Sequence, residues 1–215
     1  MEDIARVHRD EYHIDKLVLH TDSKIPLPGL TFHPKVPQES AYLYLTDEGK
    51  TGDGQPLGPI EDLVNDGYAV VTLDMRGQGE TRMEVRDDLL GDWKLFYLAY
   101  LQGKTLVGPR TEDAISGAKF IANYALPTDE KRKVHLVGVG QAGIVALHAA
   151  AVHPDLFATV TIKNAPPSWT NIVGDQNAQG QLDSIVNGAL QVYDLPDLVR
   201  LAGGSEKVKF ETTED

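Results

Sequence analysis

Residues 133–147 read Lys133-Val134-His135-Leu136-Val137-Gly138-Val139-Gly140-Gln141-Ala142-Gly143-Ile144-Val145-Ala146-Leu147. The apolar, β-branched run Val134–Val137 predicts a buried strand. The run Ala142–Val152, which His153-Pro154 ends, predicts a helix. Because only a few glycine-rich residues separate the two runs, the stretch indicates a strand that turns sharply into a helix, which is typical of an α/β protein.

The segments on either side repeat this pattern. Further apolar runs predict strands at Ala41–Leu45, Ala69–Leu73 and Ala158–Ile162, with a last strand at Lys207–Glu211. Helices are predicted at Pro59–Asp66, from an N-cap at Thr111 through Ala122, at Ala142–Val152 and at Pro196–Ala202. Runs that are apolar on both faces favour a mostly parallel sheet between helices. We therefore predict a three-layer α/β/α sandwich.

The chain length and the order of segments predict one domain. Its 215 residues fit a single domain of ordinary size. Residues 1–35 predict antiparallel lead-in strands, since apolar and polar residues alternate there before Pro26 and Pro28. Residues 36–215 then form the βα core. We predict no second domain within residues 1–215.

The glycines after the strand allow two interpretations. Gly138, Gly140 and Gly143 fit the pattern G-x-G-x-x-G, which lets a pyrophosphate approach a helix N-terminus in dinucleotide-binding proteins. That site also needs an acid near the end of the following strand, where this chain has Lys163 and Asn164. The glycines could also serve only close packing of the helix on the strand.

The alternative is a nucleophile elbow, G-x-S-x-G, in which Gly140 stands where the serine would be. Two other segments support it: Asp74-Met75-Arg76-Gly77-Gln78-Gly79-Glu80-Thr81 and His153-Pro154-Asp155-Leu156-Phe157-Ala158. With the segment Tyr193–Leu198, these resemble, in order, motifs of the α/β-hydrolase superfamily. The resemblance runs from about Tyr42 to Phe210 and is closest to acetyl xylan esterases and dienelactone-hydrolase-like proteins.

The resemblance implies a catalytic serine, a carboxylate and a histidine, in that chain order. Gly140 has no side chain, and all seven histidines precede residue 154. After the last predicted strand, the candidate for the catalytic acid is Asp215. We predict no catalytic residues, a C-terminally shortened sheet, and a degenerate hydrolase with a structural, regulatory or ligand-binding role. One alternative is an active esterase completed by Ser168 or by another chain.

The same resemblance assigns the positions of an oxyanion hole, the pair of N–H donors that stabilises a negative oxygen. One donor would be the Gln141 amide at the degenerate elbow formed with Gly138, Gly140 and Gly143. The other would lie in the loop Thr46-Asp47-Glu48-Gly49-Lys50. The carboxylates of Asp47 and Glu48 would oppose such an oxyanion unless they point away.

Composition limits the partners. Hydrophobic residues make up 41% and charged residues 24%, and the net charge of −12 repels phosphate backbones and anionic lipid. We expect neither nucleic acid nor a membrane as partner, and no cofactor or metal site. A small-molecule or carbohydrate ligand is compatible with the pattern, as is a second copy or neighbouring domain that covers the last strand. We expect a soluble protein without a signal peptide, and the residues do not indicate a compartment.

Overall fold

The structure is a computed structural model, and it describes residues 1–22, 24–83, 93–124, 131–178 and 181–212. The strands are β1 (Glu2–His8), β2 (Tyr12–His20), β3 (Pro26–Pro34), β4 (Ser40–Leu45), β5 (Ala69–Leu73), β6 (Lys133–Val139), β7 (Phe157–Lys163) and β8 (Val208–Glu211). The helices are α1 (Pro59–Asn65), α2 (Trp93–Leu101), α3 (Val107–Asn123), α4 (Ala142–Val152), α5 (Trp169–Gly174) and α6 (Leu195–Leu201).

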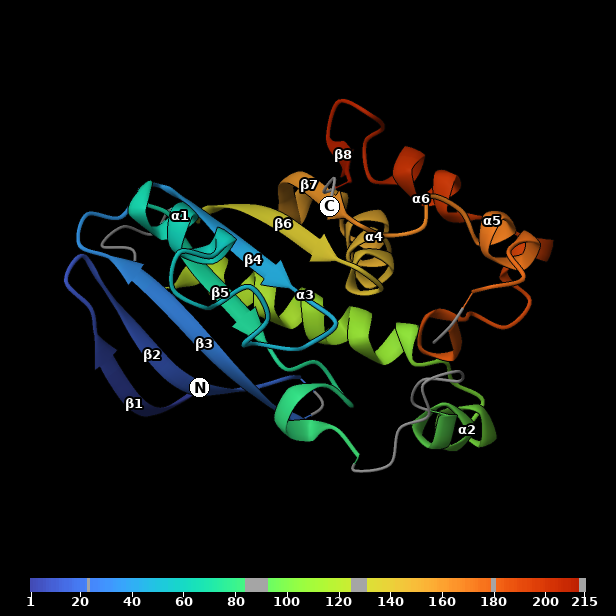
Figure 1. The fold of residues 1–215 in the computed structure, drawn as a ribbon, viewed down its shortest axis with the longest axis horizontal. Helices are drawn as coiled ribbons and strands as arrows, with labels where there is room; N and C mark the ends of the chain where they lie inside the picture. The colour runs from blue at the N-terminus through green and yellow to red at the C-terminus, as the bar shows by residue number, and fades with distance from the viewer. Residues whose placement is uncertain (23, 84–92, 125–130, 179–180, 213–215) are drawn as a thin grey trace.

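The described strands form one mixed sheet in the order β1-β2-β3-β5-β4-β6-β7-β8 (Figure 1). The β1–β2, β2–β3 and β3–β5 pairs are antiparallel, whereas the β4–β5, β4–β6, β6–β7 and β7–β8 pairs are parallel. The first three strands are antiparallel, and the predicted mostly parallel sheet is confirmed. Parallel strands need crossover connections, which α1, α3, α4 and α6 supply.

Helices cover both faces of this sheet because successive strand residues point to opposite sides. On β4, Ala41, Leu43 and Leu45 face a core shared with α3, α4 and α6. Tyr44 lies on the other face, in a second core with Ile60 of α1. The predicted three-layer sandwich is therefore confirmed, and its central strands are buried on both sides.

One helix boundary was predicted wrongly. Helix α3 begins at Val107, so Thr111 lies inside the helix and is not its N-cap. The Thr111 hydroxyl donates a hydrogen bond to the Val107 carbonyl oxygen at 2.8 Å, a bond that threonine can form within a helix. The buried face predicted for this helix, Ala114 to Ala122, is present.

The other differences are small or concern segments without a clear sequence pattern. Strand β6 extends one residue before and two after the predicted Val134–Val137, and α6 begins at Leu195 with Asp194 as its N-cap. Helices α2 and α5 were not predicted. None of the helices in the described ranges combines the length and apolar character that crossing a bilayer requires.

Candidate functional site at the β6–α4 turn

The turn between β6 and α4 holds the backbone conformation that a nucleophile elbow requires. Gly140 lies between the two elements with a φ of 62°, in the left-handed region where a residue with a side chain is strained. Its N–H donates to the Lys163 carbonyl oxygen at the end of β7 at 2.8 Å. The sequence prediction of a sharp strand-to-helix turn at this position is confirmed.

Strand register brings Asp47 to this turn. Strands β4 and β6 are parallel neighbours, and Leu45 is paired with Gly138. Asp47 and Gly140 each follow two residues later, so both leave the sheet at the same end. A side-chain Cβ placed on Gly140 would overlap the Asp47 carboxylate. Asp47 therefore occupies the space into which a residue at position 140 would project.

The Asp47 carboxylate accepts hydrogen bonds from two backbone amides at the start of α4. Its Oδ2 atom lies 2.8 Å from the Gln141 nitrogen, and its Oδ1 atom lies 2.7 Å from the Ala142 nitrogen. Free amides and the helix dipole favour negative charge at this place. Burial raises the pKa of Asp47, and the two amide hydrogen bonds only partly oppose that shift. Glu48, the other carboxylate of this loop, is exposed.

A buried ion pair fixes the loop that carries Asp47. Asp74, which is completely buried at the end of β5, accepts hydrogen bonds from the Lys50 amide at 2.7 Å and from Lys50 Nζ at 2.5 Å. It also accepts one from the Glu80 amide at 3.0 Å. Burial lowers the pKa of Lys50, but its hydrogen bonds to Asp74 and Glu80 outweigh this effect and raise it. Asp74 thus joins the two loops beside the turn.

Arg76 has a similar anchoring role. Its backbone N–H and its Nε each donate to the buried Asp113 carboxylate of α3 at 2.9 Å. Burial raises the pKa of Asp113, while the hydrogen bonds and charge of Arg76 act in the opposite direction. Through these contacts, Asp74 and Arg76 both fix loops beside the turn.

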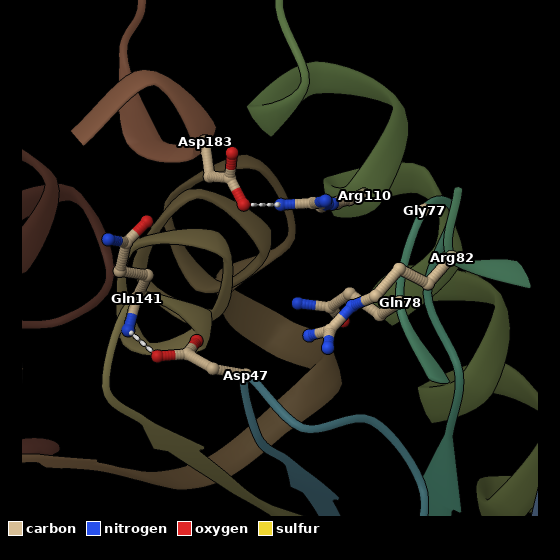
Figure 2. Close-up of a pocket in the computed structure, with 7 residues that line it drawn as sticks. All are labelled: Asp47, Gly77, Gln78, Arg82, Arg110, Gln141 and Asp183. Carbon is tan, nitrogen blue, oxygen red and sulfur yellow. Dashed lines mark hydrogen bonds and ion pairs between the residues drawn. The ribbon is translucent and has the colours of Figure 1, made fainter. Parts of the chain in front are cut away.

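A small polar cavity lies beside the turn. Its volume is about 40 Å³ and it is lined by Asp47, Gly77, Gln78, Arg82, Arg110, Gln141 and Asp183. Figure 2 shows Asp47 and Gln141 on one side, Gln78 and Arg82 on the other, and Asp183 with Arg110 above them. The space is large enough to hold water. Its two aspartates are already engaged, Asp47 by amides and Asp183 by Arg110 at 3.8 Å.

The comparisons with known proteins agree with this geometry. A family model described as the alpha/beta hydrolase fold matches residues 57–198, more than half of the chain. The chain belongs to the α/β hydrolase fold family. No curated protein matches it. Among solved structures, a Bacteroides fragilis protein provisionally named an acetyl xylan esterase superposes with a TM-score of 0.71 at 14% identity, over 98% of this chain and 69% of that one.

Two further solved structures extend the comparison. An acetyl xylan esterase of Paenibacillus sp. R4 has a TM-score of 0.61 at 15% identity, over 98% of this chain and 70% of its own. A cold-adapted esterase from an Arctic intertidal metagenomic library has a TM-score of 0.62 at 14% identity, over 99% of this chain and 89% of that one. At these identities, the likeness concerns the fold.

In this α/β hydrolase, Gly138 and Gly143 serve close packing. A Cβ on Gly138 would lie 2.7 Å from the Gly143 Cα and 2.8 Å from the Ala146 Cβ. A Cβ on Gly143 would lie 2.8 Å from Ile162 Cγ2 and 2.9 Å from the Ala165 Cβ. The glycine pattern is thus explained by α4 lying directly on β6 and β7. The α4 amides that a pyrophosphate would need are held by Asp47.

Ser168 lies in another hydrogen-bond network. It is the N-cap of α5, and its hydroxyl donates to Asp194 Oδ2 at 2.5 Å and accepts from the Thr170 amide at 2.9 Å. A serine nucleophile instead needs its proton taken by a base, usually an imidazole. Within the described part of the chain, this hydroxyl bonds to Asp194 and the Thr170 amide and to no histidine.

Asp194 should make the stability of the protein depend on pH. Burial alone would raise its pKa, but hydrogen bonds from Ser168, Thr170 and the Trp169 and Leu195 amides lower it to about 2. A depressed pKa stabilises the fold fully above about pH 4 and progressively less as the pH falls to about 2. We expect Asp194→Asn to cost about 1 to 2 kcal/mol at pH 7 and less than about 0.5 kcal/mol at pH 2, where the wild-type carboxylate is half protonated.

Urea unfolding of both proteins at pH 7, 4 and 2 measures this difference. Asp155→Asn, at an exposed aspartate in the short turn after α4, is the control and should change stability little at each pH. A deficit of Asp194→Asn that stayed constant down to pH 2 would contradict the role of the carboxylate charge.

The histidines lie elsewhere. His135, within β6 as predicted, stacks on Tyr42 and contacts the Thr159 hydroxyl at 2.7 Å. His148, within α4 as predicted, contacts the Ile144 carbonyl oxygen at 2.7 Å and the Tyr193 hydroxyl at 3.0 Å. Burial lowers the pKa of both side chains. No histidine is among the described residues that line the cavity, and Asp215 lies outside the described residues.

Four side chains of the cavity were not identified from the sequence: Gln78, Arg82, Arg110 and Asp183. Gln78 belongs to the motif that begins at Asp74, and that motif could have indicated that Gln78 lies near the turn. Arg110 is buried within α3 and Asp183 follows α5 by several residues, and no local pattern connects either with the turn.

Proposed function

We propose that this chain is a catalytically inactive α/β hydrolase, related to carbohydrate esterases, with a structural, regulatory or ligand-binding role. The observation that carries the proposal is the Asp47 carboxylate on the Gln141 and Ala142 amides, beside Gly140. Asp47 thereby binds the amide that would stabilise an oxyanion, and its carboxylate occupies the space into which a nucleophilic side chain at position 140 would project.

The chemistry of ester hydrolysis explains why this arrangement opposes catalysis. A hydroxyl must attack the acyl carbon, and amide donors must stabilise the negative oxygen that develops. Gly140 offers no hydroxyl, and a carboxylate on the Gln141 amide places negative charge where that oxygen would form. Since like charges repel, an acyl transition state would be disfavoured there even if water acted as nucleophile.

The first experiment measures whether the protein has a reactive serine. We expect no labelling of the wild-type chain by a serine-directed fluorophosphonate and no hydrolysis of p-nitrophenyl acetate above background. Stoichiometric modification of one serine would overturn the proposal. Modification at Ser168 would favour the alternative esterase, for which the short Ser168–Asp194 hydrogen bond is the supporting observation.

The second experiment restores the missing hydroxyl. Gly140→Ser should unfold more readily, by about 1 to 3 kcal/mol, because the residue has a left-handed φ and its Cβ overlaps Asp47. It should also remain inactive towards p-nitrophenyl acetate. Robust turnover by this variant would contradict the proposed loss of the catalytic machinery.

A double-mutant cycle separates backbone strain from the overlap with Asp47. In an Asp47→Gly background the overlap is absent, so Gly140→Ser should cost less there than in the wild-type background. We expect a coupling of about 1 kcal/mol from urea unfolding of the four proteins. Equal costs in both backgrounds would mean that backbone strain causes the whole loss of stability and that the overlap with Asp47 contributes nothing.

Dinucleotide binding has an equally direct test. The amides that would hold a pyrophosphate bind Asp47, and a carboxylate there repels phosphate. We therefore expect NAD(P)H to leave the melting temperature unchanged. A clear, concentration-dependent rise would favour the dinucleotide-binding alternative.

An apolar cavity near α5 could hold the ligand if the protein has a ligand-binding role. It lies between α5 and the short helical turns that follow it, has a volume of about 200 Å³, and is lined mainly by apolar side chains, including Trp169, Ile172 and Val186. Such a lining suits an apolar small molecule better than a carbohydrate.

Coverage of β8 by a second copy or a neighbouring domain stays a prediction. Within the described sheet, β8 pairs with β7 alone.

A further inference from the structure

The antiparallel strands at the start of the chain bring histidines together. In the register of β2 and β3, His13 lies opposite His33, and in that of β1 and β2, His8 lies opposite His13. Asp15 is two residues from His13 and therefore lies on the same face. These residues form a cluster on three adjacent strands, and none of them lines the cavity beside Asp47.

The donor atoms of three of these side chains converge. Asp15 Oδ2 lies 3.7 Å from His13 Nε2 and 4.0 Å from His33 Nε2. One ligand atom from each of His13, Asp15 and His33 can be chosen so that all lie within 4.8 Å of one another. The rings of His13 and His33 are stacked with centroids 4.8 Å apart, which holds their nitrogens on one side of the sheet.

Two buried polar atoms of this cluster have no hydrogen-bond partner among the described residues. They are His33 Nε2 and Thr31 Oγ1, and Thr31 lies opposite Asp15 on the neighbouring strand. His33 is only 9% exposed and Thr31 is completely buried. Buried polar atoms normally have partners, and the His33 nitrogen is therefore available to a group that binds between these strands.

The surrounding charges restrict what that group can be. Arg6 binds both oxygens of Asp15, at 2.6 Å to Oδ1 and 2.9 Å to Oδ2, and Arg6 is half exposed. Arg132 and Tyr124 also face His33. An added cation must therefore overcome nearby positive charge, and only an ion that bonds strongly to imidazole nitrogen can do so. Mg²⁺ and Ca²⁺, which prefer oxygen ligands, are excluded on this ground.

We propose that His13, Asp15 and His33 form a binding site for Zn²⁺. Two imidazole nitrogens, one carboxylate oxygen and an open fourth position are a ligand set that zinc accepts. Tetrahedral zinc bonds of about 2.0 to 2.2 Å place the ligand atoms about 3.3 to 3.6 Å apart. Donors that lie within 4.8 Å of one another must therefore approach by up to about 1.5 Å, which side-chain rotation can supply. Asp15 keeps the hydrogen bond from Arg6 Nε on Oδ1, while Oδ2 exchanges the hydrogen bond from Arg6 Nη2 for the bond to the metal.

Equilibrium dialysis of the untagged full chain against ZnCl₂, followed by metal analysis, tests this site. We expect one bound Zn²⁺ per chain for the wild type and for His20→Asn, an exposed histidine of the same strand that contacts Glu2. His33→Asn and His13→Asn should each weaken binding by at least about tenfold. MgCl₂ at the same concentration should not compete.

Cobalt absorption provides a second readout. Co²⁺ in this site should show visible d–d bands that are absent from both cluster variants and unchanged in His20→Asn. If His33→Asn fails to fold, His13→Asn, whose side chain is more exposed, still decides the matter. No Zn²⁺ bound by the wild type, or binding that either cluster variant retains at full strength, would overturn the proposal.

Discussion

Asp74→Asn is expected to lower the free energy of unfolding by about 3 to 5 kcal/mol. The substitution keeps the shape of the side chain but removes the charge that pairs with the buried Lys50 ammonium at 2.5 Å. Among the described residues, Lys50 would then keep the exposed Glu80 as its ion-pair partner. Urea unfolding monitored by circular dichroism measures the change.

Glu80→Gln is the matched control for this prediction. Glu80 also pairs with Lys50 Nζ, at 2.6 Å, but its side chain is 69% exposed. An exposed pair contributes little, so we expect a loss below about 1 kcal/mol. If both substitutions cost the same, burial of the Asp74–Lys50 pair would not be what fixes the loops beside the β6–α4 turn.

Gly138→Ala is the second large effect that we expect, with a loss of about 3 kcal/mol of stability. Its methyl group would lie 2.7 Å from the Gly143 Cα and 3.0 Å from the Ala142 carbonyl oxygen. Both neighbours belong to the backbone of α4, so the contact is relieved only if the helix moves away from β6. Thermal and urea unfolding both report this change.

Gly174→Ala at the end of α5 provides the control, because a Cβ there would meet no atom within 4 Å. Alanine favours helix over glycine, so this change should be neutral or stabilise by up to about 1 kcal/mol. If Gly138→Ala were equally harmless, close packing would not explain the glycine pattern, and its dinucleotide interpretation would regain support.

Much of the fold could be predicted because the central strands are buried on both faces. Ala69–Leu73 and Ala142–Val152 were predicted with their observed bounds, since an uninterrupted apolar run, bounded by turn residues, is a local property. Thr111 misled the prediction because threonine is a good N-cap, whereas here it bonds back to Val107 inside a longer helix. Helix α2 has apolar residues on its exposed side as well as its buried side, so its sequence lacks the periodicity that predicts a helix.

The candidate site could be predicted only in part. The residues identified the turn at Gly140, the loop that contains Asp47 and Glu48, and the conflict between a carboxylate and an oxyanion. They did not indicate which of the two carboxylates points to the turn. Arg110 and Asp183 reach the cavity from distant segments, and no local pattern encodes that approach.

The sequence by itself determined that position 140 has no attacking side chain, because that depends on one residue. Tertiary structure decided that Asp47 occupies the neighbouring amides. This contact requires β4 to lie beside β6 with Leu45 opposite Gly138, a register set by packing across the whole sheet. The His13, Asp15 and His33 cluster arises in the same way, since cross-strand pairing brings together residues that are separated in sequence.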